Sequence, residues 1–153
     1  MIIAFCGHSN YVENSGDEEK IIRILTSRAE NGNEFFLGEY GGFDSFAYKC
    51  AEKFKKTHMD SKLIFVTPYI YEQYRKKSTD YEKRFDLILY PELENVPPKY
   101  AISRRNKWIV EKADIIIAYI THRYGGAYAM YSYAKRKNKE IYNIAEIELS
   151  TMG

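Results

Sequence analysis

The sequence predicts an α/β fold in which helices cover both faces of a mostly parallel sheet of five to six strands. Two observations predict it. The apolar runs are short and continuous rather than alternating, as expected of parallel strands that are buried on both faces. Stretches with apolar residues at helical spacing separate these runs. The 153 residues and the 45% hydrophobic content are enough for one three-layer domain, which we place over residues 1–153.

In chain order, the predicted strands are the apolar runs 1–6, 34–37, 61–66, 86–89, 114–119 and 140–144. The first helix is expected to begin with a capping box that runs from Ser15 to Glu18 and to end at residues 31–33. Its apolar positions recur at helical spacing: Ile21, Ile22, Leu25 and Ala29. The first predicted strand, 1–6, and this helix form a first βα unit.

The second helix follows the glycine pair Gly41 and Gly42, and it is the clearest amphipathic helix of the chain. Lysines lie opposite an apolar stripe formed by Phe43, Phe46, Ala47, Cys50 and Phe54. A further helix is expected over residues 101–112, and another follows the second glycine pair, Gly125 and Gly126. Segment 68–100 mixes tyrosines, charges and prolines, and we expect either a lid or partner surface, or a covering layer on the sheet edge. The residues after 144 are expected to form a short, weakly specified tail.

The formal charge of +2, from 23 basic and 21 acidic residues, gives little support to nonspecific nucleic-acid binding. The basic clusters 53–56, 75–77 and 135–139 each come late in a helical segment, where cations favour the helix C-terminus. The apolar run at residues 1–6 is too short to span a membrane, so we expect a cytoplasmic protein without membrane contact. Cys6 and Cys50 are expected to be reduced, buried thiols. No metal-binding spacing links them to His8, His58 or His122, so we expect no metal site, and we also expect no cofactor.

Three loops that follow predicted strands carry small and polar residues. They are 7–10 after the first strand, 39–44 after the second, and 121–126 after the fifth. Glycine pairs let a backbone approach a ligand, and the helix that follows offers free N–H groups to an anion. Because such loops converge at the carboxyl edge of a doubly wound sheet, we expect one crevice for a phosphorylated small molecule. The ligand-binding residues predicted from these loops are Gly7, His8, Ser9, Gly41, Gly42, Asp44, Thr121, Arg123, Gly125, Gly126 and Tyr128.

Arg105 and Asn106 complete the predicted ligand-binding set. The helical register places Arg105 on the sheet-facing side with Trp108 and Ile109, where a guanidinium needs an anion or a carboxylate. A ligand phosphate is one candidate. A salt bridge to Glu39, Asp44 or Asp114 is the other.

Two carboxylates flank the first glycine pair and are the candidate catalytic residues. Asp44 stands where it would stabilise the start of a helix, whereas Glu39 at a strand end could accept ribose hydroxyls or act as a general base. His8 is expected either to polarise a phosphate or to cap its turn. His58 and His122 are expected to face solvent.

The order of these motifs resembles the SLOG superfamily over about residues 1–144. The matching segments are 4–9, 41–44 with Ala47 and Ala51, 105–106 before 113–119, and 125–126 with Ala134. This Rossmann-like group includes the LOG phosphoribohydrolases, the DprA-type DNA-processing proteins and the small YpsA-like and YspA-like proteins. The likeness is greatest to the small members, which are single domains proposed to bind nucleotides. The resemblance implies a Rossmann-like fold and a homo-oligomer.

The chain departs from the LOG pattern at the catalytic position. Gly125 and Gly126 match that pattern, but Tyr128, Ala129 and Ser132 stand where it has a third glycine, a threonine and a catalytic glutamate. A serine does not replace this base near neutral pH without an activating partner. We therefore expect a protein that binds a nucleotide or a nucleotide-derived molecule without turnover, as a sensor or sequestering protein, with the base stacked on Tyr128 or Tyr40. The alternatives are a nucleotide N-glycosidase of the phosphoribohydrolase or deoxyribosyltransferase type, and a single-stranded nucleic-acid or protein adaptor of the DprA type.

Overall fold

The structure is a computed structural model that describes residues 1–69 and 80–152. Six strands form one all-parallel sheet in the order β4-β3-β2-β1-β5-β6. The strands are β1 (Ile2–Gly7), β2 (Glu34–Leu37), β3 (Lys62–Val66), β4 (Leu87–Leu89), β5 (Ile115–Tyr119) and β6 (Glu140–Asn143). The predicted fold class is confirmed, and all six predicted strands are present.

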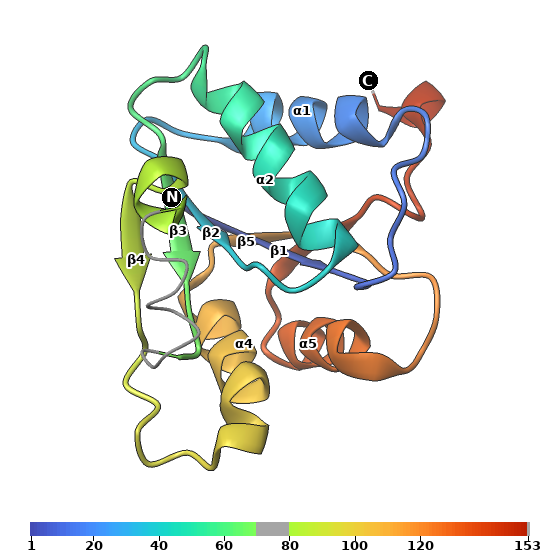
Figure 1. Ribbon diagram of the computed structural model, residues 1–153. Helices are drawn as coiled ribbons and strands as arrows, with labels where there is room; N and C mark the ends of the chain where they lie inside the picture. The colour runs from blue at the N-terminus through green and yellow to red at the C-terminus, as the bar shows by residue number, and fades with distance from the viewer. Residues whose placement is uncertain (70–79, 153) are drawn as a thin grey trace.

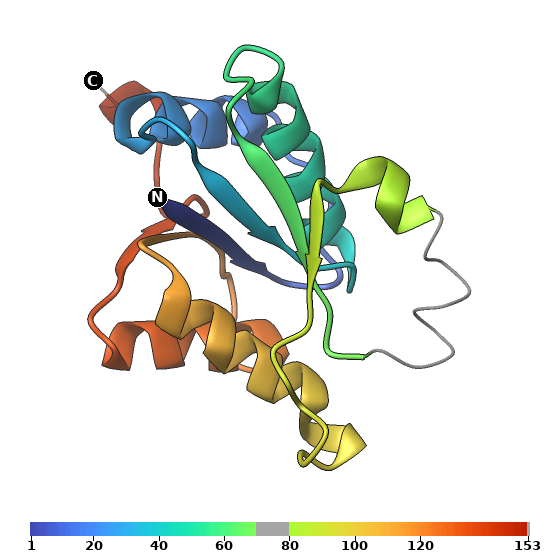
Figure 2. The same ribbon diagram turned by 90° about the vertical axis from the view of Figure 1, so that its left-hand side faces the viewer.

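Helices cover both faces of the sheet (Figures 1 and 2). The first face carries α1 (Asp17–Arg28) and α2 (Gly42–Lys55), and the second carries α4 (Ala101–Lys112) and α5 (Gly125–Arg136). Two short 3₁₀ helices, η1 (Pro98–Tyr100) and η2 (Leu149–Thr151), precede α4 and follow β6. Because α1 and α2 lie on one face and α5 on the other, the winding reverses between β1 and β5.

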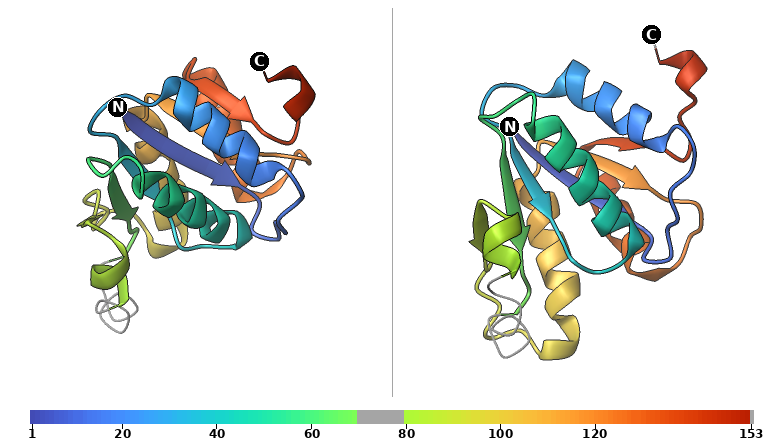
Figure 3. Two further views of the ribbon diagram at one scale, coloured as in Figure 1. Left: turned by 90° about the horizontal axis from the view of Figure 1, so that it is seen from above. Right: turned by 45° about the horizontal axis from the view of Figure 1, so that its top comes forward.

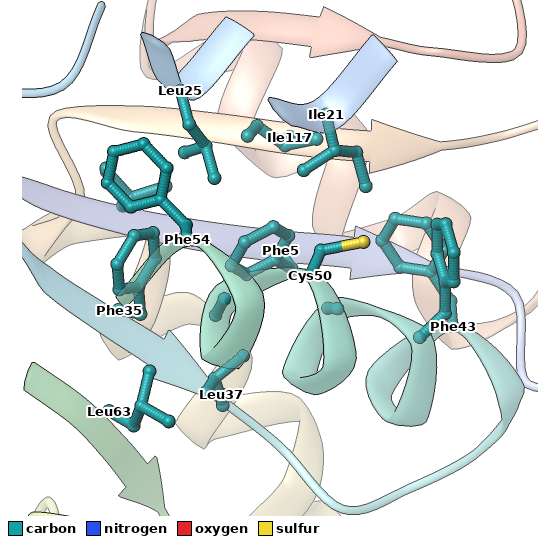
Figure 4. Close-up of a cluster of buried hydrophobic side chains, with 14 of the residues drawn as sticks. Phe5, Ile21, Leu25, Phe35, Leu37, Phe43, Cys50, Phe54, Leu63 and Ile117 are labelled. Carbon is teal, nitrogen blue, oxygen red and sulfur yellow. The ribbon is translucent and has the colours of Figure 1, made fainter. Parts of the chain in front are cut away.

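Alternate residues of each strand enter two separate cores. Phe5, Phe35 and Leu37 pack under α1 and α2, whereas Cys6 and Phe36 pack under α4 and α5. Figure 4 shows the first core, in which the apolar stripes of the two helices meet the strands. Buried side chains on both faces explain why the strands read as continuous apolar runs.

The first helix begins differently from the prediction. Its N-cap is Gly16 in a left-handed conformation (φ 89°), and no side chain caps it, so the capping box at Ser15 is not formed. Asp17 is buried instead, and its Oδ2 accepts hydrogen bonds from Tyr11 Oη (2.8 Å) and Asn14 Nδ2 (3.2 Å). The acidic first turn stabilises the positive end of the helix without a cap.

The C-terminal segment is better packed than the prediction of a weakly specified tail. Ile144 is fully buried in the first core, and Ile147 and Met152 pack against it. Lys20 Nζ donates a hydrogen bond to the Ile144 carbonyl oxygen (3.1 Å). The segment thereby lies beside the start of α1 (Figure 3).

Segment 68–100 falls partly outside the described residues, since Tyr71, Tyr74 and the basic cluster 75–77 belong to residues 70–79. Residues 80–84 are helical, and the Tyr81 ring packs on Phe65 at 4.5 Å between centroids. This part of the segment packs on β3, which lies next to the edge strand β4, and the expectation for residues 70–79 lies outside the described residues.

Candidate ligand-binding site

A cavity of about 370 Å³ lies at the carboxyl ends of β1, β2 and β5, where the segments leaving these strands meet on one side of the sheet (Figure 1). The helices α4 and α5 supply the rest of its wall. Eight of the predicted ligand-binding residues line it: Gly7, His8, Ser9, Asp44, Arg105, Asn106, Gly125 and Gly126. The strand order therefore brings together three loops that are distant in sequence.

Other predicted site residues do not line this cavity: Glu39, Gly41, Gly42, Thr121, Arg123 and Tyr128. The Glu39 carboxylate forms an ion pair with Arg84 (2.7 Å). The Tyr128 ring instead contacts Tyr131 on the same helix, at 6.5 Å between centroids. The tyrosines in the cavity wall are Tyr40 and Tyr124, which are 38% and 71% exposed.

Gly41 and Gly42, the first glycine pair, allow two loops to pack closely. A Cβ on Gly41 would lie 2.5 Å from Ser9 Cα, and a Cβ on Gly42 would overlap the Tyr11 carbonyl oxygen. The Gly42 N–H donates a hydrogen bond to the Ser9 carbonyl oxygen (2.7 Å). The pair thus lets the loop after β2 lie directly on the loop after β1, and the expected phosphate contact at this turn is not available to the Gly42 N–H.

The second glycine pair is open. A Cβ on either Gly125 or Gly126 would meet no heavy atom within 4 Å, and both residues line the cavity. Gly125 begins α5 with a left-handed backbone (φ 89°), and no side chain caps the helix. The first N–H groups of a helix have no acceptor within the helix. The start of α5 therefore offers the cavity backbone donors and the positive end of a helix dipole.

Arg105 is buried in the cavity wall, with 5% of its surface exposed. Its Nη1 donates to the Val66 carbonyl oxygen (3.1 Å), and its Nε and Nη2 donate to Asn106 Oδ1 (3.2 and 2.7 Å). The Tyr40 ring lies 5.2 Å from the guanidinium carbon. Burial lowers the pKa of Arg105, and the nearby Asp44 opposes this shift.

The salt bridges proposed for Arg105 are not formed. Within residues 1–69 and 80–152, no carboxylate oxygen lies within 4.0 Å of its guanidinium nitrogens. Asp114 accepts a hydrogen bond from the Ile2 N–H (2.6 Å), and Asp44 accepts one from the Tyr40 N–H (2.8 Å). Three of the five guanidinium N–H groups have acceptors among these residues, which leaves two for a bound anion.

Among the described residues that line the cavity, Asp44 has the one carboxyl group. The side chains of Asp44 and Arg105 both lie next to Gly38. A Cβ on Gly38 would lie 2.9 Å from Asp44 Oδ2 and 3.0 Å from Arg105 Nη1. Burial raises the pKa of Asp44, against the lowering effects of Arg105 and the Tyr40 N–H. The sequence prediction missed Gly38, since a lone glycine after a strand has no distinctive pattern.

Two histidines form one side of the cavity. The His8 and His122 rings stack at 3.6 Å between centroids, and the Tyr124 ring stacks on His122 at 3.8 Å. His8 Nε2 accepts a hydrogen bond from the Thr121 N–H (3.0 Å), so His8 joins the first and third loops. His122 is half-buried rather than facing solvent as expected, and its Nδ1 is buried without a hydrogen-bond partner among the described residues. His58 is exposed, as expected.

Cys6 also lines the cavity, a position that the sequence prediction assigned only to a buried strand. Its Sγ donates to the Ala127 carbonyl oxygen (3.1 Å). Burial, followed by the charge of Asp44, raises the pKa of the thiol to about 12. Both cysteines are buried and free, as predicted.

The described residues contain no group of three or more histidine, cysteine or acidic side chains placed to hold a metal ion. Among these residues, no helix has the length and apolar character needed to cross a membrane.

The sequence matches no protein-family model and no curated protein. Solved structures with a similar fold include DNA processing protein A from Helicobacter pylori, which has a single-stranded DNA binding mode. It aligns with a TM-score of 0.61 and 19% identity over 92% of this chain and 63% of its own. DNA processing protein A (DprA) from Streptococcus pneumoniae aligns with a TM-score of 0.59 and 19% identity, over 91% and 48%.

The chain thus spans about 63% and 48% of the lengths of these two proteins. At 19% identity the likeness shows the fold alone, a Rossmann-like fold that this chain shares with the two DNA processing proteins.

Proposed function

We propose that the cavity binds a nucleotide or a nucleotide-derived small molecule, with its phosphate group at Arg105 and the start of α5. The observation that carries this proposal is the buried Arg105 guanidinium, which lacks a carboxylate partner within 4.0 Å in the described chain. A buried charge is costly unless a counter-charge and hydrogen bonds meet it. A phosphate accepts from the two guanidinium N–H groups that have no acceptor among the described residues, and from the open backbone at Gly125 and Gly126.

The base is proposed to stack on Tyr40 or Tyr124, the two tyrosines of the cavity wall. Tyr128 drops out as a stacking candidate, because it packs along α5. The volume of about 370 Å³ suits a small ligand of this class. Since Ser132 occupies the position of the LOG glutamate, we propose binding without turnover, in a sensor or sequestering role.

Calorimetry with AMP, ADP-ribose, NAD and cyclic nucleotides tests this proposal. Arg105→Met retains the bulk of the buried side chain and removes its charge, and we expect it to weaken binding at least tenfold. Arg104→Met is the matched control, because Arg104 is exposed on the same helix and outside the cavity wall. Absence of binding by every ligand, or equal loss in both variants, would contradict the proposal.

An N-glycosidase is the second candidate, and Asp44 is the residue that favours it. A half-buried carboxylate with a raised pKa is suited to general acid or base catalysis. Glu39 is less suited, since it pairs with Arg84 outside the cavity. Release of free base from a nucleotide, abolished by Asp44→Asn and retained in Glu39→Gln, would support this activity.

A single-stranded nucleic-acid adaptor is the third candidate. The outer surface of α4 and α5 carries exposed cations, and α5 contains no acidic residue. These cations are Arg104, Lys107, Lys112, Lys135, Arg136 and Lys137. Three of them lie over the Tyr133 ring, so charge and aromatic surface occur together, as in proteins that bind single strands.

A mobility shift with single-stranded DNA that weakens steeply with salt would support the adaptor role. Replacing Lys135, Arg136 and Lys137 with glutamate should then abolish the shift, while leaving nucleotide binding in the cavity intact. A homo-oligomer is also proposed, and light scattering after size-exclusion chromatography measures it directly.

A further inference from the structure

The described wall of the cavity contains the Arg105 guanidinium, which carries a positive charge, and the Asp44 carboxyl group, which carries a negative charge when it is ionised. Two other titratable side chains of the wall, Cys6 and His8, add no charge at neutral pH. The pKa of Cys6 is about 12, and that of His8 is lowered by burial and then by His122. The start of α5 contributes roughly half a positive charge. Among Arg105, Asp44 and the start of α5, positive charge therefore exceeds negative charge by only about half a charge when Asp44 is ionised.

Asp44 is held where a ligand at Arg105 must meet it. The Tyr40 N–H fixes its Oδ2 at 2.8 Å, and both side chains flank Gly38. The charge of Asp44 also contributes to the raised pKa of the Cys6 thiol, so its field extends to the strand side of the cavity. The charged groups that act on Asp44 are Arg105 and Glu39, and the latter adds a second negative influence.

We propose that Asp44 makes this cavity selective for a phosphodiester, which carries one negative charge, over a terminal phosphate monoester, which carries close to two at neutral pH. This inference rests on the proposed nucleotide-binding function and specifies the ligand class. A second negative charge on the phosphate is repelled by the half-buried Asp44 carboxylate, and the cavity offers no further arginine or lysine in its described wall. The phosphodiester can belong to a cyclic nucleotide, a dinucleotide or a nucleic-acid strand, which share this chemistry.

AMP and its 5′-methyl ester form the deciding pair of probes, because they differ only in the methyl group and the charge of the phosphate. In calorimetry at pH 8, we expect the methyl ester to bind at least tenfold more tightly than AMP. At pH 5 the ratio should approach one, since the second ionisation of a phosphate monoester lies near pH 6. Protonation of Asp44 at low pH lowers the ratio in the same direction, so the Asp44→Asn variant at pH 8 is the measurement that assigns the preference to the Asp44 charge.

Asp44→Asn should bring the two affinities within about twofold at pH 8, mainly by strengthening AMP binding. The asparagine oxygen can still accept the Tyr40 N–H, and Asp44→Ser provides a second uncharged variant. Glu39→Gln is the control and should retain the preference, because Glu39 lies outside the cavity wall. Cyclic AMP and the dinucleotide ApA then separate the sources: tight binding of the former assigns a small cyclic ligand, and tight binding of ApA alone assigns a strand.

The outcomes separate this inference from the function on which it rests. Binding of both probes with equal affinity, a preference for AMP, or a ratio that is unchanged in Asp44→Asn overturns the selectivity while the nucleotide-binding proposal stands. Failure of every phosphate ligand to bind the wild-type protein overturns both.

Discussion

His8 and His122 stack face to face with 3.6 Å between their ring centroids, although they come from the loops after β1 and β5. The His8 Nε2 also accepts the Thr121 N–H. These two contacts join the loops on either side of the point where the winding of the sheet reverses. The stack therefore shapes the cavity wall and makes it sensitive to protonation.

Acidification should destabilise the fold through His8. Burial, and to a lesser extent His122, holds the pKa of His8 below its usual value. Between the lowered pKa and the usual one, the unfolded chain therefore binds a proton at His8 that the folded chain does not bind. Stability from His8 is therefore complete above about pH 6.5 and is lost as the pH falls from there toward the lowered pKa. Urea unfolding from pH 8 to pH 5 measures the effect. His8→Gln, which keeps an acceptor for Thr121, should show a shallower loss, and an identical pH profile would contradict this role.

Asp44→Asn should stabilise the protein near neutral pH. Burial holds the folded pKa of Asp44 above its unfolded value, so stability is lost as the pH rises through this interval. We expect a gain in the free energy of unfolding at pH 7 and a smaller gain near pH 4, where the wild-type carboxyl group is closer to its neutral form. Thermal unfolding at the two pH values tests the sign. A variant that is less stable than wild type at pH 7 would show that the attraction to Arg105 outweighs the cost of burial.

Alanine substitution should lower the free energy of unfolding at the first glycine pair and change it little at the second. Gly42→Ala forces a methyl group onto the Tyr11 carbonyl oxygen, and we expect a loss of about 2–3 kcal/mol in the free energy of unfolding. Gly126→Ala meets open space, so stability should stay within about 1 kcal/mol of wild type. Denaturant titrations measure both. Nucleotide binding should weaken in Gly126→Ala, because the methyl group enters the cavity, and equal stability of the two variants would refute the distinction.

The two cysteines should be nearly inert toward thiol reagents in the folded protein. Burial raises the pKa of both Cys6 and Cys50 to about 12, and only the thiolate reacts. At pH 8 we expect modification roughly a thousandfold slower than for an exposed cysteine, followed by rapid reaction of both thiols in urea. Ellman's reagent gives both rates. Fast labelling of one cysteine under native conditions would indicate that its core opens locally.

The sequence predicted the strands and the α2 stripe because burial on both faces leaves a clear apolar pattern. The register that places Arg105 toward the sheet was also correct, since a helix of regular period fixes which residues share a face. The cavity wall was predicted in part, because Arg105, Asp44 and the second glycine pair line it.

The rest depended on contacts that no local pattern records. A glycine pair has the same signature whether it admits a ligand or a neighbouring loop, and only the position of Ser9 and Tyr11 distinguishes these uses at Gly41 and Gly42. Glu39 has the sequence position of a site carboxylate, but in the folded protein it forms an ion pair with Arg84, which is distant in the sequence. His122 was missed for the same reason, because its partner His8 lies at the opposite end of the sequence.

The central place of β1 has a consequence for how the molecule acquires its fold. β1 pairs with β2 on one side and with β5 on the other, and β5 follows it by more than half the chain. Until the later strand docks, one flank of the innermost strand is an unpaired edge that can recruit other chains. Parallel pairing across so long a loop is entropically slow to close, so folding is expected on a millisecond-to-second scale, with its greatest aggregation risk before β5 arrives.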